Sequence, residues 1–237
     1  MSQATPAADR GEFVTVPETV LPGGLVVPGF RAGQYLAARG DDGLPVSVAD
    51  LAPWVRIDYH EARRVAAAAG TPMIADSQSL ALAYQIALQP ANWTGGRVGA
   101  GKLYQGLRKG RMSSAQPATY ESPDPDERRW FELPGGQRIY DIAGNAFSWV
   151  FDDIQGNENG LVARPFAADS PSIVIPYPAE EKGQGWTPRA GVDWSGLALV
   201  RGGFWHSGRH AGAFGLDGGW PDSRYDHVAV RCTLPGL

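Results

Sequence analysis

The sequence contains very little cysteine, since Cys232 is the single thiol among 237 residues. One cysteine cannot form a disulfide within the chain, so no internal disulfide framework holds the fold together. A lone cysteine usually behaves as a small buried apolar residue, and we expect this role for Cys232. The stability of the fold must therefore come from its packed core.

An excess of positive charge and long apolar runs are also missing. Lys and Arg number 21 against 25 Asp and Glu, so the net charge is −4, and no bulk positive field attracts nucleic acid or an anionic membrane. No stretch approaches the roughly 20 apolar residues of a membrane span. Residues 1–9 lack the charged head and the apolar core of a secretory signal. We therefore expect no nucleic-acid partner, no membrane insertion and no signal peptide.

Glycine and proline are abundant, with 31 and 19 residues. This composition disfavours a helical bundle and is typical of a loop-rich α+β protein with few long helices. A chain of this length can bury a sizeable core. Because the first residues are small and polar, we expect a flexible tail over residues 1–11 and one domain over residues 12–237.

The segment 199–232 carries two kinds of residue. Apolar residues recur along it at spacings typical of strands that bury one face. The remaining positions are polar, glycine or aromatic and have no amphipathic period of their own. We expect the apolar set to form the core and the other set to face solvent. The apolar set is Leu199, Trp205, Ala213, Phe214, Leu216, Val228 and Val230.

Two motifs frame this segment: Arg201-Gly-Gly-Phe-Trp near its start and Val228-Ala-Val-Arg-Cys at its end. They resemble the R-G-G-S-W and G-F-R-C motifs shared by formylglycine-generating-enzyme-like domains and by the variable proteins of diversity-generating retroelements. Residues 206–221 resemble the variable-protein version more closely. The resemblance implies a C-type-lectin-like α+β fold with two helices packed on small antiparallel sheets. It also implies a binding scaffold whose C-terminal segment is diversified by a reverse transcriptase that miscopies template adenines.

The amino-acid content of the segment agrees with this mode of diversification. The family's variable codons are mostly AAC in the template, so mutation at the adenines cannot produce Lys, Gln, Glu, Met or Trp. Between Arg201 and Arg231 there is no Lys, Gln, Glu or Met, although a short glycine-rich loop could lack them by chance. Trp220 does not fit and requires another template codon or a fixed role. The candidate ligand-binding, variable positions are Phe204, His206, Ser207, Arg209, His210, Gly215, Asp217, Gly218, Gly219, Trp220, Asp222, Arg224, Tyr225, Asp226 and His227.

Residues 53–70 resemble the segment that opens the first helix in both groups. Asp58 can cap this helix, with Glu61 three residues later as its capping-box partner, and Gly70 can end it. The N-terminal strands between Phe13 and Tyr35 are expected beside the Val228–Cys232 stretch, as in the resembling variable proteins.

A second helix is predicted within residues 73–90. Asp76 or Ser77 can cap it, and Pro90 can stop it. Its buried face is expected to carry the residues at spacing i, i+4 and i+8, which are Leu80, Tyr84 and Leu88.

Residues 138–153 resemble the family's D-M/L-x-G-N-V-W-E-W-V motif. Residues 143–145 are expected to form a turn into a strand in which Phe147, Trp149 and Phe151 alternate inward. Ser148 replaces the glutamate of the family, and in the enzymes acidic groups near this motif hold a calcium ion. The substitution argues against a metal at this place.

Two loop regions carry further expectations. A short strand is predicted over residues 172–176. Residues 92–129 are predicted to form long surface loops. They contain a basic patch, for which solvated loop charge is favoured over contact with a phosphate or an acidic partner. The patch comprises Arg97, Lys102, Arg108, Lys109 and Arg111.

Enzymatic alternatives fit the residues less well. Formylglycine-generating enzymes hold copper with a pair of cysteines, because thiolates bind Cu(I), and this chain has one cysteine. Sulfoxide synthases of the wider fold use three histidine ligands for iron, whereas only His60 lies outside the C-terminal segment. His206 and His210 have i, i+4 spacing, but Gly208 and Gly212 disfavour a helix there. We expect no catalytic residue, no metal and no cofactor.

The sequence therefore predicts a non-enzymatic ligand-binding or receptor-binding protein. Its partner would be a protein or another cell-surface ligand, and both a monomer and a trimer suit the resemblance. We expect the protein on a phage tail or on a cell surface, and the alternative location is the cytoplasm. The alternative is a formylglycine-generating-enzyme-like domain with an enzymatic or purely structural role in a virion.

Overall fold

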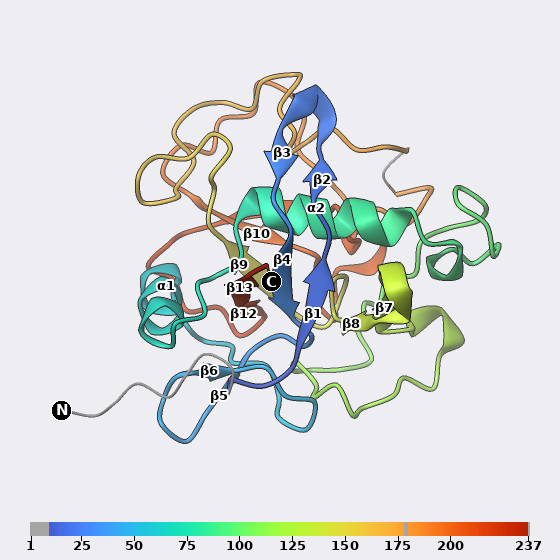
Figure 1. Cartoon of the computed structure of the whole chain (residues 1–237), viewed down its shortest axis with the longest axis horizontal. Helices are drawn as coiled ribbons and strands as arrows, with labels where there is room; N and C mark the ends of the chain where they lie inside the picture. The colour runs from blue at the N-terminus through green and yellow to red at the C-terminus, as the bar shows by residue number, and fades with distance from the viewer. Residues whose placement is uncertain (1–9, 178–179, 237) are drawn as a thin grey trace.

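The structure, a computed structural model, describes residues 10–177 and 180–236. Within them lie two α-helices, α1 (Tyr59–Ala68) and α2 (Asp76–Ala87), together with short strands joined by long loops (Figure 1). The predicted α+β class is confirmed: two helices pack on small, mostly antiparallel sheets within the described residues. No helix in the described ranges is long and apolar enough to cross a bilayer.

Strands from the two ends of the chain meet in one antiparallel sheet. β1 (Phe13–Val16) pairs with one edge of β4 (Phe30–Gly33), and β13 (Thr233–Pro235) pairs with the other edge. Figure 1 shows β13 beside β4, close to the mark of the C-terminus. The expected neighbourhood of the two ends is confirmed in part. The strand that pairs with β4 is β13, and of the predicted Val228–Cys232 stretch Cys232 accepts a backbone hydrogen bond from Gly33 at 2.9 Å.

Residues 228–230 belong to a second, four-stranded sheet, in which the strand order is β11, β10, β9, β12. The antiparallel strands β9 (Phe147–Val150) and β10 (Ala198–Arg201) form its centre, and β11 (Leu216–Gly219) extends it beyond β10. β12 (Val228–Val230) pairs in parallel with β9. Both ends of the 199–232 segment are therefore anchored in the same sheet.

Three two-stranded ribbons complete the sheet structure. They are β2 (Thr19–Val20) with β3 (Val26–Val27), β5 (Ala38–Arg39) with β6 (Pro45–Val46), and β7 (Trp130–Glu132) with β8 (Arg138–Tyr140). Short 3-10 turns lie at Pro22–Gly24, Pro90–Asn92, Pro125–Glu127, Pro134–Gly136 and Gly208–His210.

The cap of α1 is the predicted one. The Asp58 side chain accepts a hydrogen bond of 2.8 Å from the backbone N–H of Glu61, which satisfies one of the free donors in the first turn. The other half of the capping box does not form, because the Glu61 carboxylate binds Arg224 of the C-terminal segment at 2.6 Å instead. After the helix, Gly70 adopts a φ of 70°, as expected for a residue that ends a helix.

The cap of α2 was predicted wrongly. The helix begins at Asp76 itself, and Ala75 occupies the cap position without a side-chain acceptor. The Asp76 carboxylate is instead buried in an ion pair with Arg201, a residue 125 positions away. Leu88 lies past the last helical residue and is 59% exposed, so it does not extend the buried face as predicted.

The largest core cluster surrounds α2. Leu80 and Ile86 of this helix are buried together with Phe131, Phe166 and Phe214, and each such side chain contributes about 1.5–3 kcal/mol on burial. Figure 1 shows the β2–β3 ribbon crossing in front of α2.

A second core cluster packs α1 against the four-stranded sheet. Tyr59 meets the buried Trp149 ring edge to face, with centroids 5.8 Å apart. Trp149 also donates from its indole nitrogen to the Ile57 carbonyl at 3.0 Å. Of the three aromatic residues predicted to alternate inward, Trp149 is fully buried, whereas Phe147 and Phe151 are partly buried beside the same cluster.

Two expectations about loops need correction. Of the predicted tail, residues 1–9 lie outside the described residues, but Arg10 is buried and binds Asp42 at 2.6 Å, and Gly11 bridges to Ser47. Residues 172–176 form turns and loop rather than a strand, because Ser172 hydrogen-bonds to the buried Asp76 and no strand pairs with this stretch within the described structure.

Candidate ligand-binding surface

Buried arginines of the two framing motifs fix the segment 199–232 at its ends. Arg201 donates to both oxygens of Asp76, at 2.5 and 3.1 Å, and to the Ser172 and Phe214 carbonyls. Arg231 donates to the carbonyls of Gly33, Tyr140 and Asp141. Charge-assisted bonds of this kind are the stronger hydrogen bonds in proteins. The motif arginines are therefore structural, and the chain between them is held at fixed end points.

The glycine pair after Arg201 sets the direction of the chain. Gly203 has a φ of 100°, and an added Cβ would lie 2.7 Å from Ala211 Cα, so no other residue fits there. The chain then places Trp205 inward, where it packs with Leu36, Ala146 and Ala229. Phe204 is half-buried and packs against the edge of the same cluster, with its ring centroid 5.4 Å from that of Trp205.

Four of the candidate positions form a row of aromatic rings. Successive centroids lie 5.5 Å apart for Tyr225 and His227, 4.5 Å for His227 and Phe204, and 6.5 Å for Phe204 and His206. We call these four residues the aromatic row. Its inner end rests on buried Trp149, 5.9 Å from Tyr225. Residues distant in sequence thus present a continuous aromatic surface on the sheet.

Partners outside the segment hold several of the charged candidates. Arg209 and His210 contact Glu180 at 2.7 and 2.9 Å. Arg224 lies 2.9 Å from Asp58 and 2.6 Å from Glu61, at the start of α1. Exposed pairs of this kind are typically worth about 1 kcal/mol or less, so they orient the side chains without fixing the fold.

Two aspartates of the segment have altered acidity. The pKa of the Asp226 carboxyl is lowered mainly by its hydrogen bond to His227, at 2.8 Å. The Asp217 side chain is exposed as a whole, but neighbouring protein atoms partly exclude water from its carboxyl group. This desolvation raises the pKa of Asp217, and the charges of His210 and His227 oppose the rise. The Asp217 carboxylate also accepts a hydrogen bond of 2.8 Å from the Gly218 backbone N–H, which favours its ionised form.

Most of the other candidates face solvent, but not all of them do. Trp220 is 67% exposed. Ser207 is half-buried and accepts a hydrogen bond from the Phe204 backbone, so its hydroxyl is part of a turn. The exposed candidates are His206, Arg209, His210, Asp217, Trp220, Asp222, Arg224 and Asp226, and the half-buried ones are Phe204, Ser207, Gly218, Tyr225 and His227.

Two candidates contradict the expectation of a solvent-facing position. Gly215 and Gly219 are buried. A Cβ at Gly219 would lie 2.8 Å from the Trp149 ring, and a Cβ at Gly215 would lie 3.0 Å from the Gly212 carbonyl oxygen. A side chain at Gly219 would clash with Trp149, and one at Gly215 would require the neighbouring backbone to shift, so both glycines fit the scaffold better than a varied surface.

Residues outside the segment also contribute to this surface, and sequence reasoning missed them. Trp186 is 37% exposed, lies 6.4 Å from the His210 ring and accepts a backbone hydrogen bond from Leu216. Trp194 packs 6.3 Å from Trp186 and lies beneath Gly218. The only available signal was the tryptophan content of a loop without other pattern.

The basic patch of residues 97–111 is partly neutralised by neighbouring acids. Lys109 and Arg111 bind Asp124 at 2.6 and 3.1 Å. Asp126 also lies 3.1 Å from Lys109. This part of the patch is therefore internal loop structure, as favoured from the sequence.

The remaining chemistry of the segment is structural. Cys232 is buried, and burial raises the pKa of its thiol to about 12, which keeps it protonated and unreactive. Within residues 10–177 and 180–236, no three His, Cys, Asp or Glu side chains gather closely enough to hold a metal ion. The arrangement offers contact area, hydrogen-bonding groups and mixed charge.

No protein-family model and no curated protein sequence matches the chain. Among solved structures it is similar to PvdO from Pseudomonas aeruginosa, at 13% identity over 94% of each chain with a TM-score of 0.48. It is similar to the U1 variant of Major Tropism Determinant, at 17% identity over 93% of this chain and 52% of the other, with a TM-score of 0.45. Treponema denticola variable protein 1 matches at 11% identity over 94% of each chain, with a TM-score of 0.44.

The chain thus spans about half the length of the tropism determinant that it matches. With TM-scores below 0.5 and identities of 17% or less, these similarities leave the function to be argued from the chain's own surface.

Proposed function

We propose that this protein is a non-enzymatic binding protein that presents a variable surface on a C-type-lectin-like scaffold. In this proposal residues 10–236 act as one domain, and a retroelement diversifies the segment 199–232. One observation carries the proposal: within the segment, buried side chains alternate with side chains that are exposed to solvent. Buried side chains hold the sheet, whereas most of the candidate positions between them reach solvent. The buried side chains are Trp205, Phe214, Leu216, Val228 and Val230.

The chemistry of the exposed set supports a binding role. Aromatic side chains supply large contact areas with few rotatable bonds, arginine supplies a planar charged group, and small polar residues supply adaptable hydrogen bonds. The aromatic row has one edge fixed on Trp149, so its rings are ordered before a ligand arrives. Ordering in advance reduces the entropy that binding costs.

The proposed binding role also implies a class of ligand and a location for the protein. The ligand we propose is a protein or another component of a cell surface, bound by the protein as a monomer or a trimer on a phage tail or a cell surface. The names of two similar structures, a tropism determinant and a variable protein, agree with this role. Binding of this kind requires neither turnover nor a cofactor.

A pair of displayed libraries tests the proposal. The first varies six exposed positions of the segment: His206, Arg209, His210, Asp217, Asp222 and Asp226. The control library varies six exposed positions elsewhere: Glu18, Asp41, Asp50, Glu158, Arg164 and Asp169. Both are selected for binding to the same purified test protein, and folding of unselected members is measured by protease resistance.

We expect most members of both libraries to fold, since exposed substitutions usually change stability by no more than about 0.5 kcal/mol each. Binders should come from the segment library alone. Widespread unfolding of the segment library, or equal recovery of binders from both, would contradict the proposal.

A further inference from the structure

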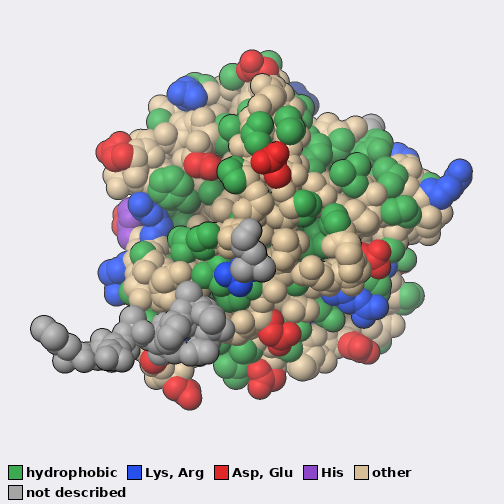
Figure 2. All heavy atoms as spheres, in the orientation of Figure 1, with side chains coloured by type: hydrophobic (Ala, Val, Ile, Leu, Met, Phe, Trp, Pro, Cys, Tyr) green, Lys and Arg blue, Asp and Glu red, His purple; other side chains and the backbone are tan. Residues whose placement is uncertain are grey.

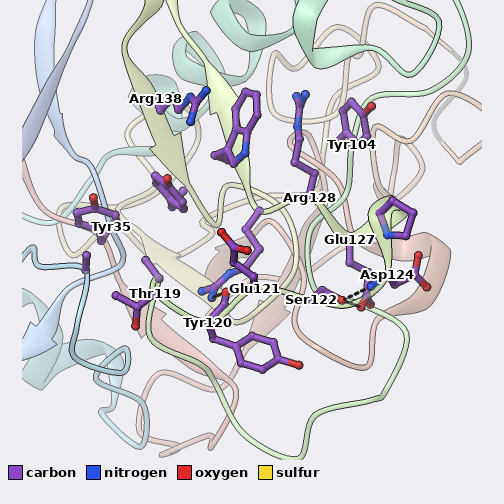
Figure 3. Close-up of a pocket in the computed structure, with 16 residues that line it drawn as sticks. Tyr35, Tyr104, Thr119, Tyr120, Glu121, Ser122, Asp124, Glu127, Arg128 and Arg138 are labelled. Carbon is purple, nitrogen blue, oxygen red and sulfur yellow. Dashed lines mark hydrogen bonds between the residues drawn. The ribbon is translucent and has the colours of Figure 1, made fainter.

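A cavity of about 530 Å³ lies away from the variable segment, at the β7–β8 ribbon and the loop 118–129. Its volume is within the range of sites that hold small organic ligands. Figure 3 shows its side chains, with Arg138 and Arg128 on one side of the view, Glu121 below them, and Tyr35 and Tyr104 at opposite ends. No residue of the segment 199–232 lines it. Diversification of that segment would therefore leave this cavity unchanged.

Arginine and aromatic side chains are stacked at the cavity wall. Arg128 lies 3.7 Å from the Tyr104 ring centroid and 3.9 Å from that of Trp130, and Arg138 lies 4.0 Å from the Trp130 centroid. The two guanidinium groups thus flank one indole. Arg128 is held in place by hydrogen bonds to the Ala91 carbonyl and to Asn92 Oδ1. The stack is preorganised, because each plane is fixed by its neighbours.

The positive charge of this stack has no ion-pair partner among the described residues. Glu132 is opposite Arg138 in the β7–β8 register, but no ion pair joins them. The Arg138 side chain donates no hydrogen bond within the described structure, and Arg128 Nε is buried without an acceptor. Figure 2 shows Lys and Arg side chains over the region of β7 and β8. The free N–H groups of the exposed Arg138 guanidinium match the geometry of a carboxylate.

Other charged groups of the cavity are already satisfied. Arg129 binds both oxygens of Asp141. Glu127 accepts from the backbone N–H groups of Arg108 and Lys109, and Asp124 is paired with Lys109. The exposed Arg138 and Glu121 therefore remain as the charged groups available to a ligand, and Arg128 holds the stack in place.

Hydroxyl groups surround the rest of the cavity. The hydroxyls of Tyr35, Tyr104, Tyr120 and Tyr140 have no hydrogen-bond partner within the described part of the chain, and the Glu121 carboxylate is exposed and likewise without one. A phenol can donate and accept, and a carboxylate accepts only, so together they complement ligand hydroxyls. Tyr35 and Tyr140 pack 5.1 Å apart and offer an aromatic floor.

The geometry points to a second binding site, which takes a small carboxylate that also carries several hydroxyl groups, such as an acidic sugar or an open-chain polyhydroxy acid. Arg138 binds the carboxylate at the rim, and the tyrosine hydroxyls and Glu121 bind the hydroxyl groups. The site is constant, whereas the segment 199–232 varies.

Titration of the full chain with four sodium salts or sugars at constant ionic strength tests this site, with ligand-observed NMR as the readout. Glucuronate represents the acidic sugars, gluconate the open-chain acids, glucose a neutral sugar and acetate a carboxylate without hydroxyls. We expect saturable binding of glucuronate, gluconate or both, and at least tenfold weaker binding of glucose and acetate. Preference between the two acids identifies the source of the ligand.

Substitutions locate the binding. Arg138→Gln should weaken it about tenfold or more, as expected when a charge-assisted hydrogen bond is lost. Arg164→Gln makes the same change at an exposed arginine outside the cavity and should have no effect. Tyr35→Phe keeps the ring and removes the hydroxyl, and should weaken binding of the hydroxylated acid several-fold. The inference is overturned if none of the four probes saturates, if glucose binds as well as the acids, or if Arg138→Gln binds like the wild type.

Discussion

Truncation of Phe214 to Ala is expected to lower the melting temperature by about 6–20 °C, which corresponds to a loss of about 3–5 kcal/mol in a protein of this size. Phe214 is fully buried in the largest core cluster and packs edge to face on Tyr84, with centroids 5.0 Å apart. Removing its ring leaves a cavity that the surrounding side chains can fill only in part. Thermal unfolding followed by circular dichroism measures the change.

Two matched comparisons belong to this prediction. Phe204→Ala removes the same ring from a half-buried position in the aromatic row, and should cost much less than Phe214→Ala. Trp205→Ala should destabilise strongly, whereas Trp220→Ala, at a residue 67% exposed, should stay within about 0.5 kcal/mol. Equal losses at Trp205 and Trp220 would mean that the segment is core throughout, and the separation of scaffold from binding surface would fail.

Replacement of Arg201 by Met is expected to cost about 3–5 kcal/mol, because it leaves the charge of a buried carboxylate without its partner. That carboxylate is Asp76, which is 0% exposed and takes two of its hydrogen bonds from Arg201. The substitution also removes the donors to the Ser172 and Phe214 carbonyls. Chemical denaturation at neutral pH gives the free energy of unfolding.

The control for this prediction is Arg224→Met, which breaks an exposed pair with Asp58 and Glu61 and should cost about 1 kcal/mol or less. A double variant, Arg201→Met with Asp76→Asn, removes the stranded charge and should recover part of the loss. If Arg201→Met is no more destabilising than Arg224→Met, the motif that begins at Arg201 does not anchor the segment 199–232, and its role is a different one.

Local patterns in the sequence predicted the elements that depend on local contacts. Asp58 caps α1 as expected, because the cap is decided within three residues of the helix start. The alternation around Trp149 predicted β9. The apolar set of the segment is buried as predicted, because a sheet buried on one face requires apolar residues at such spacings.

Long-range contacts decided the features that were predicted wrongly. Asp76 resembles a helix cap in sequence, but its carboxylate is taken by Arg201 from another part of the chain. Residues 172–176 have the composition of a strand, yet no sheet edge in the described structure accepts them. The burial of Gly215 and Gly219 depends on Gly212 and Trp149, which sequence alone does not place beside them. Trp186 and Glu180 reach the surface from a loop without a recognisable motif.

Sequencing the DNA around the gene in several isolates tests whether a retroelement diversifies the segment 199–232. We expect a near-copy of the DNA for residues 200–232, differing mainly at adenines, close to a reverse-transcriptase gene. Isolates should differ at the codons of exposed positions such as His206, Arg209 and Asp217, while Phe214 and Gly219 stay constant. A locus with neither a near-copy nor a reverse transcriptase, or with differences spread evenly along the chain, would mean that this segment is not diversified by a retroelement.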